Sequence, residues 1–147
     1  MLEVTGSLWT YPADVRVITT NGTVKKNGEC VMGRGCAAEA KKKWPWVAAK
    51  LGLAVMNCAN TPRILSDPSE TDCATLVSMP VKHEWFQKAD TSLIKVSATI
   101  LARYADLHEW RVVVLPRPGC GNGGLRWEDV RPILEPILDN RFHVITW

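Results

Sequence analysis

The sequence has no apolar stretch that approaches the ~18 residues needed to span a lipid bilayer. It also has no apolar N-terminal segment of the kind that directs secretion. Its five cysteines form no C-x-x-C pair and no cysteine–histidine spacing typical of a zinc site. We therefore expect free thiols, no bound metal, no membrane association and a cytoplasmic location.

Internal repeats and low-complexity tracts are absent too, so nothing divides the 147 residues into smaller units. The length suits one domain with its own core, and 46% hydrophobic and 22% charged residues are globular values. A net charge of +3 is a small excess for a nucleic-acid-binding surface. The dense basic run Lys41–Lys43 is interpreted as a solvated helix end, with a DNA or RNA contact as the alternative. We expect one domain over residues 1–147 and a monomer.

The glycines of the sequence are concentrated in two loops. The first loop lies in Val112–Val130, where a β-branched run predicts a buried strand and an apolar spacing of three and four residues predicts a helix. Four glycines stand between them, at positions 119, 121, 123 and 124. The helix is expected to begin near Arg126 or Trp127, with its free N–H groups facing the loop. This arrangement suits a phosphate. The alternative is a glycine-rich connection that binds nothing.

The second glycine loop, Val31–Gly35, repeats this order. It follows an expected interior strand at Val15–Thr20 and precedes an expected helix at Cys36–Lys43, which must end before Pro45. Two such units side by side would direct two helix N-termini at one place.

The remaining elements complete an alternation of strands and helices. Asp90 or Thr91 is expected to cap a long helix. The apolar face of this helix is expected to contain Leu93, Val96, Ile100, Leu101 and Tyr104. A short helix is expected at Trp46–Leu51, ended by Gly52. Further strands are expected at Leu2–Thr5 (an edge strand), Ala54–Met56, Arg63–Leu65, Thr75–Met79 and Phe142–Trp147. The pattern predicts the α/β class: a three-layer α/β/α sandwich with a mixed central sheet whose later strands are parallel.

Four segments in this order resemble those of macrodomains, the ADP-ribose-binding α/β/α modules. They are Gly6–Leu8, Asn21 together with Val31–Gly35, Pro80–Trp85, and Pro118–Trp127. The last two resemble the branch that includes the terminal ADP-ribose glycohydrolase and the bacterial antitoxin that removes ADP-ribose from DNA. In that branch a Pro-x-Lys-x-x-Trp segment supplies a lysine at the distal ribose, which Lys82 matches here.

The resemblance implies a role for particular residues. Asn21 would contact the distal ribose and act with Lys82 in catalysis, while the two glycine loops would enclose the diphosphate. Trp147 or Phe142 would flank the adenine. The residues implied to bind ADP-ribose are Ser7, Leu8, Asn21, Val31, Met32, Gly33, Gly35, Pro118, Gly119, Cys120, Gly121, Asn122, Gly123, Gly124 and Trp147. No cofactor is implied besides this ligand.

Two positions depart from the family pattern. Many macrodomains have aspartate, which binds the adenine amino group, where this chain has Ser7. A serine accepts a hydrogen bond without a charge and should hold the base less tightly. The human glycohydrolase has an acid where this chain has Gly123, so the antitoxin-like pattern is nearer.

The function expected from these residues is removal of ADP-ribose from a protein carboxylate or a nucleic-acid base. The partner would be ADP-ribose, or an ADP-ribosylated protein or nucleic acid. The alternatives are a non-catalytic reader of ADP-ribose and a phosphatase acting on ADP-ribose 1″-phosphate. Simpler interpretations also stand: Lys82 as a surface lysine, Asn21 as a turn residue and Cys120 as a small filler.

Overall fold

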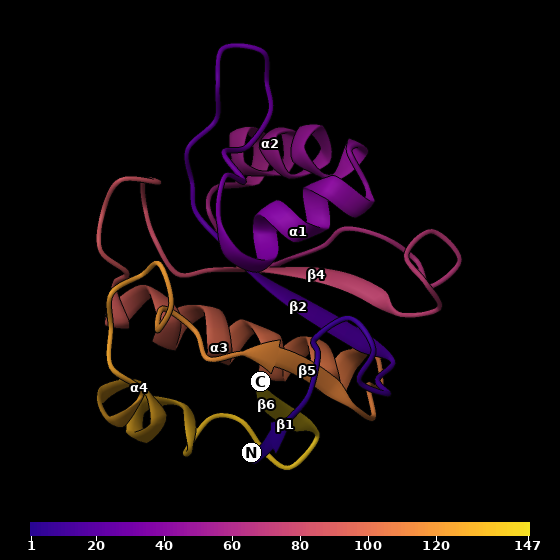
Figure 1. Ribbon diagram of the computed structural model, residues 1–147, viewed down its shortest axis with the longest axis vertical. Helices are drawn as coiled ribbons and strands as arrows, with labels where there is room; N and C mark the ends of the chain where they lie inside the picture. The colour runs from indigo at the N-terminus through magenta and orange to yellow at the C-terminus, as the bar shows by residue number, and fades with distance from the viewer.

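A six-stranded sheet forms the middle layer of the computed structural model, which describes residues 1–147. Its strands follow the order β1-β6-β5-β2-β4-β3. The elements are β1 (Leu2–Thr5), β2 (Val15–Thr20), α1 (Gly35–Lys43), α2 (Trp46–Cys58), β3 (Arg63–Ile64), β4 (Thr75–Pro80), α3 (Thr91–Leu107), β5 (Val113–Pro116), α4 (Trp127–Leu134) and β6 (Phe142–Thr146). Helices α1 and α2 cover one face of the sheet, and α3 and α4 cover the other (Figure 1).

The sheet is mixed, and all its neighbouring strands except one pair are parallel. β2 pairs in parallel with β4 and β5, and β6 pairs in parallel with β5 and β1. Only the two-residue edge strand β3 runs antiparallel, against β4. The predicted three-layer sandwich with a mixed sheet is therefore confirmed.

Two hydrophobic cores form because successive strand residues point to opposite faces of the sheet. In β2, Val15 and Val17 belong to the core under α3 and α4, whereas Ile18 belongs to the core under α1 and α2. Strands buried on both faces have few positions for polar side chains except at their ends. Polar residues at strand ends are therefore the ones free to build a site.

The predicted short helix and strand at residues 46–56 are wrong, because α2 continues unbroken from Trp46 to Cys58. Gly52 does not end the helix. It lies in the helix where the backbone of a neighbouring loop approaches, and a Cβ there would fall 1.9 Å from the carbonyl oxygen of Gly28. Glycine is therefore present for close packing and not as a helix end.

Helix α3 begins where predicted, with the Asp90 side chain accepting a hydrogen bond from Ser92 N at 2.8 Å. The predicted apolar face is largely wrong. The buried stripe contains Ile94, Ala98, Leu101 and Ala105, while Val96 is 54% exposed. Ala98 and Ala105 are small enough to let the helix lie close to the sheet, and they share the buried stripe with the larger Ile94 and Leu101.

Helix α4 begins at Trp127 as predicted but ends at Leu134, although the apolar spacing continues to Leu138. Pro136 has no N–H group to continue the helical hydrogen bonds. Leu138 is nevertheless buried in the same core as Val130 and Leu134. Its amide bonds the carbonyl of Leu134 in the turn that follows the helix.

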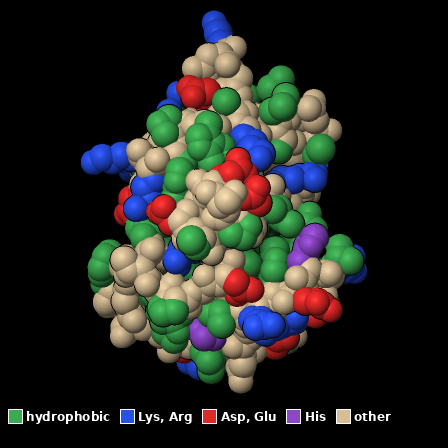
Figure 2. Space-filling model, turned by 90° about the vertical axis from the view of Figure 1, so that its right-hand side faces the viewer, with side chains coloured by type: hydrophobic (Ala, Val, Ile, Leu, Met, Phe, Trp, Pro, Cys, Tyr) green, Lys and Arg blue, Asp and Glu red, His purple; other side chains and the backbone are tan.

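Figure 2 shows the face at the amino ends of the strands, where acidic, basic and hydrophobic side chains are interspersed.

No helix has the length and apolar character needed to cross a bilayer. All five cysteines are free thiols.

Candidate functional site

A cavity of about 980 Å³ lies at the carboxyl ends of β2, β4 and β5. The segment that follows each of these strands contributes to it: Asn21 and Thr23 after β2, Lys82 and Trp85 after β4, and Arg117 after β5. The crevice outside the carboxyl ends of parallel strands is the usual ligand site of α/β sheets. We refer to this space as the large cavity.

A second cavity of about 670 Å³ lies beside the first, toward the ends of β1 and β6. We refer to it as the small cavity; Leu8, Trp9, Trp127 and Trp147 are among its lining residues. Both cavities share Cys36, Pro116, Arg117 and Gly121 in their walls. They therefore form one elongated cleft.

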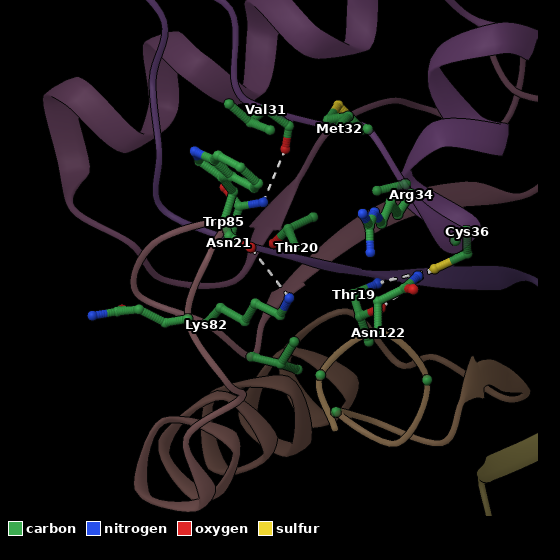
Figure 3. Close-up of a pocket in the computed structure, with 18 of the residues that line it drawn as sticks. Thr19, Thr20, Asn21, Val31, Met32, Arg34, Cys36, Lys82, Trp85 and Asn122 are labelled. Atoms are coloured by element: carbon green, nitrogen blue, oxygen red, sulfur yellow. Dashed lines mark hydrogen bonds between the residues drawn. The ribbon is translucent and has the colours of Figure 1, made fainter. Parts of the chain in front are cut away.

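The two glycine loops face each other across this cleft. A Cβ on Gly35, which has a φ of +60°, would lie 3.2 Å from the side-chain nitrogen of Asn122, so the loops meet at these residues. Figure 3 shows Asn122 below Arg34 and Cys36 at this point. At Gly33 and Gly121 a Cβ would meet no protein atom within 4 Å. Backbone at these two positions is therefore open to a ligand in the cleft.

Only one of the two predicted helix N-termini faces the large cavity. Gly35, Cys36 and Ala37, the first residues of α1, line it, and the N-cap residue makes no side-chain hydrogen bond to the helix. The first turn of α4 instead lines the small cavity and carries Glu128 and Asp129. Those carboxylates offset the positive end of the helix dipole. The two helix N-termini therefore open onto different ends of the cleft and not onto one place, as was expected.

The large cavity is electropositive. Its charged lining residues are Lys25, Arg34, Lys82, Lys88 and Arg117, and no aspartate or glutamate lines it. Two of the five have carboxylate partners outside the cavity, at 3.8 Å for Lys25 and 3.6 Å for Arg117. The free N–H groups at the start of α1 add to the positive potential. The cavity is therefore suited to an anionic ligand.

Asn21 is held by hydrogen bonds at both ends of its amide. Its side-chain nitrogen donates to the carbonyl of Val31 at 3.0 Å, and its side-chain oxygen accepts from Thr23 N at 3.0 Å. The first bond ties the end of β2 to the glycine loop Val31–Gly35. Asn21 is therefore a fixed residue of the cavity wall and not a hairpin turn.

Lys82 reaches the cavity from the segment after β4. Its amine donates a hydrogen bond to the carbonyl oxygen of Trp85 at 3.3 Å (Figure 3). Thr23 fixes the same segment, because its hydroxyl donates to the Glu84 carboxylate and accepts from Trp85 N at 2.9 Å. The lysine is therefore positioned by contacts to the end of β2.

His83 anchors this segment from its other side. Its Nε2 donates to the Asp90 carboxylate at 2.7 Å, and this hydrogen bond lowers the pKa of Asp90. Because Asp90 also caps α3, the helix start and the Lys82 segment are joined through one carboxylate.

The two cysteines in the cleft are not activated nucleophiles. Burial raises the pKa of both the Cys36 and the Cys120 thiol. A thiol with a raised pKa stays protonated at neutral pH and reacts slowly. Thr19 N lies 3.4 Å from the Cys36 sulfur, which fixes this thiol where the two cavities join.

The structure gathers most of the residues predicted to bind ligand around the cleft. Lys82, Asn21, Val31, Met32, Gly33, Gly35, Gly119, Asn122, Gly123 and Gly124 line the large cavity, Gly121 lines both, and Leu8, Cys120 and Trp147 line the small one. Ser7 and Pro118 line neither. The Ser7 hydroxyl instead accepts a hydrogen bond from Trp9 N at 3.2 Å.

Sequence reasoning missed several lining residues. They include Thr19, Thr20, Thr23, Lys25, Arg34, Cys36, Phe86, Lys88 and Arg117 in the large cavity, and Trp9, Glu39 and Arg126 in the small one. For Thr19 and Thr20 a signal was available, because polar residues end an otherwise apolar parallel strand. No such local signal marks Lys88 or Arg117.

Comparison of the sequence with protein-family models and with curated proteins finds no match. Solved structures are similar. The macrodomain of Mycobacterium tuberculosis DarG is 25% identical with a TM-score of 0.75, covering 97% of this chain and 95% of that one. The Thermus aquaticus DarG macrodomain is 22% identical with a TM-score of 0.80, covering 99% and 96%. Thermosipho africanus DarTG, solved in complex with ADP-ribose, is 18% identical with a TM-score of 0.79, covering 95% of this chain.

The protein therefore has the macrodomain fold. The predicted resemblance to macrodomains, including the branch of the DNA-ADP-ribose-removing antitoxin, is confirmed. The chain spans 39% of the DarTG chain that it matches, and nearly all of the two DarG macrodomains.

Proposed function

We propose that the cleft binds ADP-ribose and that the protein removes ADP-ribose from a protein carboxylate or a nucleic-acid base. The observation that carries the proposal is the large cavity itself: five cations and no acid, enclosed by two glycine loops, with Lys82 at one end. In this cleft the diphosphate lies between the glycine loops, beside the N-terminus of α1. The similar structure of DarTG in complex with ADP-ribose supports this assignment.

The two cavities indicate where each end of the ligand lies. The small cavity, with Trp9, Trp127 and Trp147 in its wall, receives the adenine, because tryptophan offers a flat apolar face to a base. The distal ribose then extends into the large cavity toward Asn21 and Lys82. This orientation brings the anomeric carbon to the lysine.

In the proposed reaction the unprotonated amine of Lys82 attacks the anomeric carbon of the distal ribose. The bond from that carbon to the target breaks, and the target leaves with the bonding electron pair and takes up a proton. Opening of the sugar ring gives an imine with Lys82, and water hydrolyses this imine to release ADP-ribose and the free lysine.

Of the two target classes, a base is favoured by an exposed aromatic pair at the mouth of the large cavity. Trp85 and Phe86 are 52% and 67% exposed, and their rings lie 5.8 Å apart in an edge-to-face arrangement. Both line the cavity that contains Lys82. Aromatic side chains stack on nucleobases with a gain of about 1–3 kcal/mol per base.

A non-catalytic reader of ADP-ribose is the second candidate. It is favoured by the absence of any carboxylate from the lining of the large cavity, which leaves no acidic side chain to activate water. The two functions differ in whether ADP-ribose is released.

The test is a turnover screen of the purified protein. The substrates are ADP-ribosylated single-stranded DNA, a glutamate-linked ADP-ribosyl peptide and ADP-ribose 1″-phosphate. The proposal predicts release of ADP-ribose from the DNA or the peptide. Binding of ADP-ribose without release from any substrate supports the reader, and release of phosphate alone supports a phosphatase.

A further inference from the structure

Thr20, the last residue of β2, has a buried hydroxyl with no hydrogen-bond partner. The residue is 5% exposed, and its Oγ1 contacts no donor or acceptor in the protein. Its main chain is satisfied, since its carbonyl accepts from Val81 N at 2.9 Å. An unpaired buried polar group costs about 1–3 kcal/mol, so native proteins keep few of them.

Thr20 is one of the residues that line the large cavity. Three other buried side-chain atoms lack partners, namely Asn60 Oδ1, Arg63 Nε and Arg117 Nε, and of these residues only Arg117 also lines the cavity. Figure 3 shows Thr20 beside Asn21, with the amine of Lys82 nearby. The unpaired hydroxyl therefore lies at the end of the cavity that contains the two candidate catalytic residues.

Asn21 has fewer free hydrogen-bonding groups for a ligand than its place in the cavity wall indicates. Its amide already donates to the carbonyl of Val31 and accepts from Thr23 N, and the bond to Val31 holds the glycine loop Val31–Gly35 in place. The Thr20 hydroxyl is free both to donate and to accept. A sugar hydroxyl has the same double capacity, so the two groups are complementary.

We propose that Thr20 Oγ1 hydrogen-bonds a hydroxyl of the distal ribose of ADP-ribose, which is the terminal sugar of the ligand. The inference rests on the proposed binding of ADP-ribose. It adds a residue that discriminates a ligand with this terminal ribose from one without it. The hydroxyl has almost no contact with solvent in the free protein, so the Thr20 side chain has to turn toward the cavity for the sugar to reach it.

Thr20→Val tests this assignment, because valine has the shape of threonine without the hydroxyl. We expect its affinity for ADP-ribose to fall at least about tenfold, and its affinity for ADP, which lacks the terminal ribose, to stay within about twofold. Without ligand, its unfolding temperature should equal or exceed that of the wild type, because an unpaired buried hydroxyl has been removed. Thr20→Ser, which keeps the hydroxyl, should bind ADP-ribose within about threefold of wild type.

Thr99→Val is the matched control. Thr99 lies exposed on α3, and its hydroxyl bonds the carbonyl of Lys95 in the same helix, away from the cleft. It should leave both affinities unchanged in calorimetry.

The outcomes separate this inference from the proposed function. If the wild type binds neither ADP-ribose nor ADP, the proposed function fails and the inference fails with it. If the wild type binds ADP-ribose and Thr20→Val binds it equally well, only the Thr20 assignment is overturned. It is also overturned if Thr20→Val weakens both ligands equally or lowers the unfolding temperature, since the hydroxyl then has a structural role.

Discussion

A side chain on Gly22 would place its Cβ only 2.7 Å from the carbonyl oxygen of His83. The amide of Gly22 also donates a hydrogen bond to that oxygen at 3.1 Å. The segment after β2 and the segment that carries Lys82 are thus in backbone contact with no space between them. This backbone contact and the side-chain bond to the Trp85 carbonyl both help to position Lys82.

Gly22→Ala should therefore destabilise the protein. The added methyl group meets backbone at His83 and lies 2.8 Å from the Asn60 side chain, so the segment must shift. We expect a loss of about 1–3 kcal/mol in the free energy of unfolding, measured by urea denaturation. Gly33→Ala is the control, because a Cβ there meets nothing, and should cost less than about 0.5 kcal/mol. Equal stability of the two variants would contradict the proposed contact.

Gly33→Val and Gly121→Val test the cleft without disturbing the fold. A Cβ at either position points into space that only a ligand would fill. Calorimetry should show at least about a tenfold loss of ADP-ribose affinity, with thermal unfolding near that of the wild type. Unchanged affinity in both variants would place the diphosphate elsewhere.

Lys82→Ala distinguishes the enzyme from the reader. If the lysine attacks the anomeric carbon, it acts on the transition state more than on bound ADP-ribose. Turnover should fall at least about a hundredfold, or about 2.7 kcal/mol, while ADP-ribose affinity stays within about threefold.

Lys82→Arg should be as inactive as the alanine variant, because a guanidinium stays protonated. Borohydride should trap an ADP-ribosyl adduct on the wild type alone. Full turnover by Lys82→Ala would rule out the lysine as the nucleophile and direct attention to Asn21 and a water held by the loops.

Asp90 should make stability depend on pH in the acid range. The hydrogen bond from His83 lowers the folded-state pKa of Asp90 below its ordinary value of 3.8. Its stabilising contribution is therefore present above that value and is lost as pH falls through the folded-state pKa. Asp90→Asn keeps a good helix cap without the charge, so its stability should fall less between about pH 5 and pH 2. If the urea midpoints of the wild type and of Asp90→Asn fall by the same amount as the pH is lowered, this role of Asp90 is refuted.

Much of the fold was predictable because strand and helix periods are local properties of the sequence. The strand at Val15–Thr20 and the cap at Asp90 are found where predicted, and the strand predicted at Phe142–Trp147 is found one residue shorter, at Phe142–Thr146. The errors at α2 and α3 arise from close packing. Gly52 and Ala98 are small because another backbone or the sheet approaches them, and the local sequence does not show which distant residue comes close.

The residues of the candidate site that belong to a continuous loop motif were predicted. Those that only the fold topology brings to the cavity were missed. The glycine loops and Lys82 belong to continuous segments, so their residues could be found together. Arg117 and Lys25 are almost a hundred positions apart, and only the parallel order of β2 and β5 brings them to one cavity. The unpaired hydroxyl of Thr20 has no sequence signal beyond its place at the end of a buried strand.

Titration of the wild-type protein with ADP-ribose in a calorimeter tests the central claim most directly. The cleft predicts binding at one site with micromolar affinity, equivalent to about −8 kcal/mol, and a matching rise in the unfolding temperature. Absence of both heat and thermal shift at millimolar ADP-ribose would contradict the claim that this cleft binds ADP-ribose.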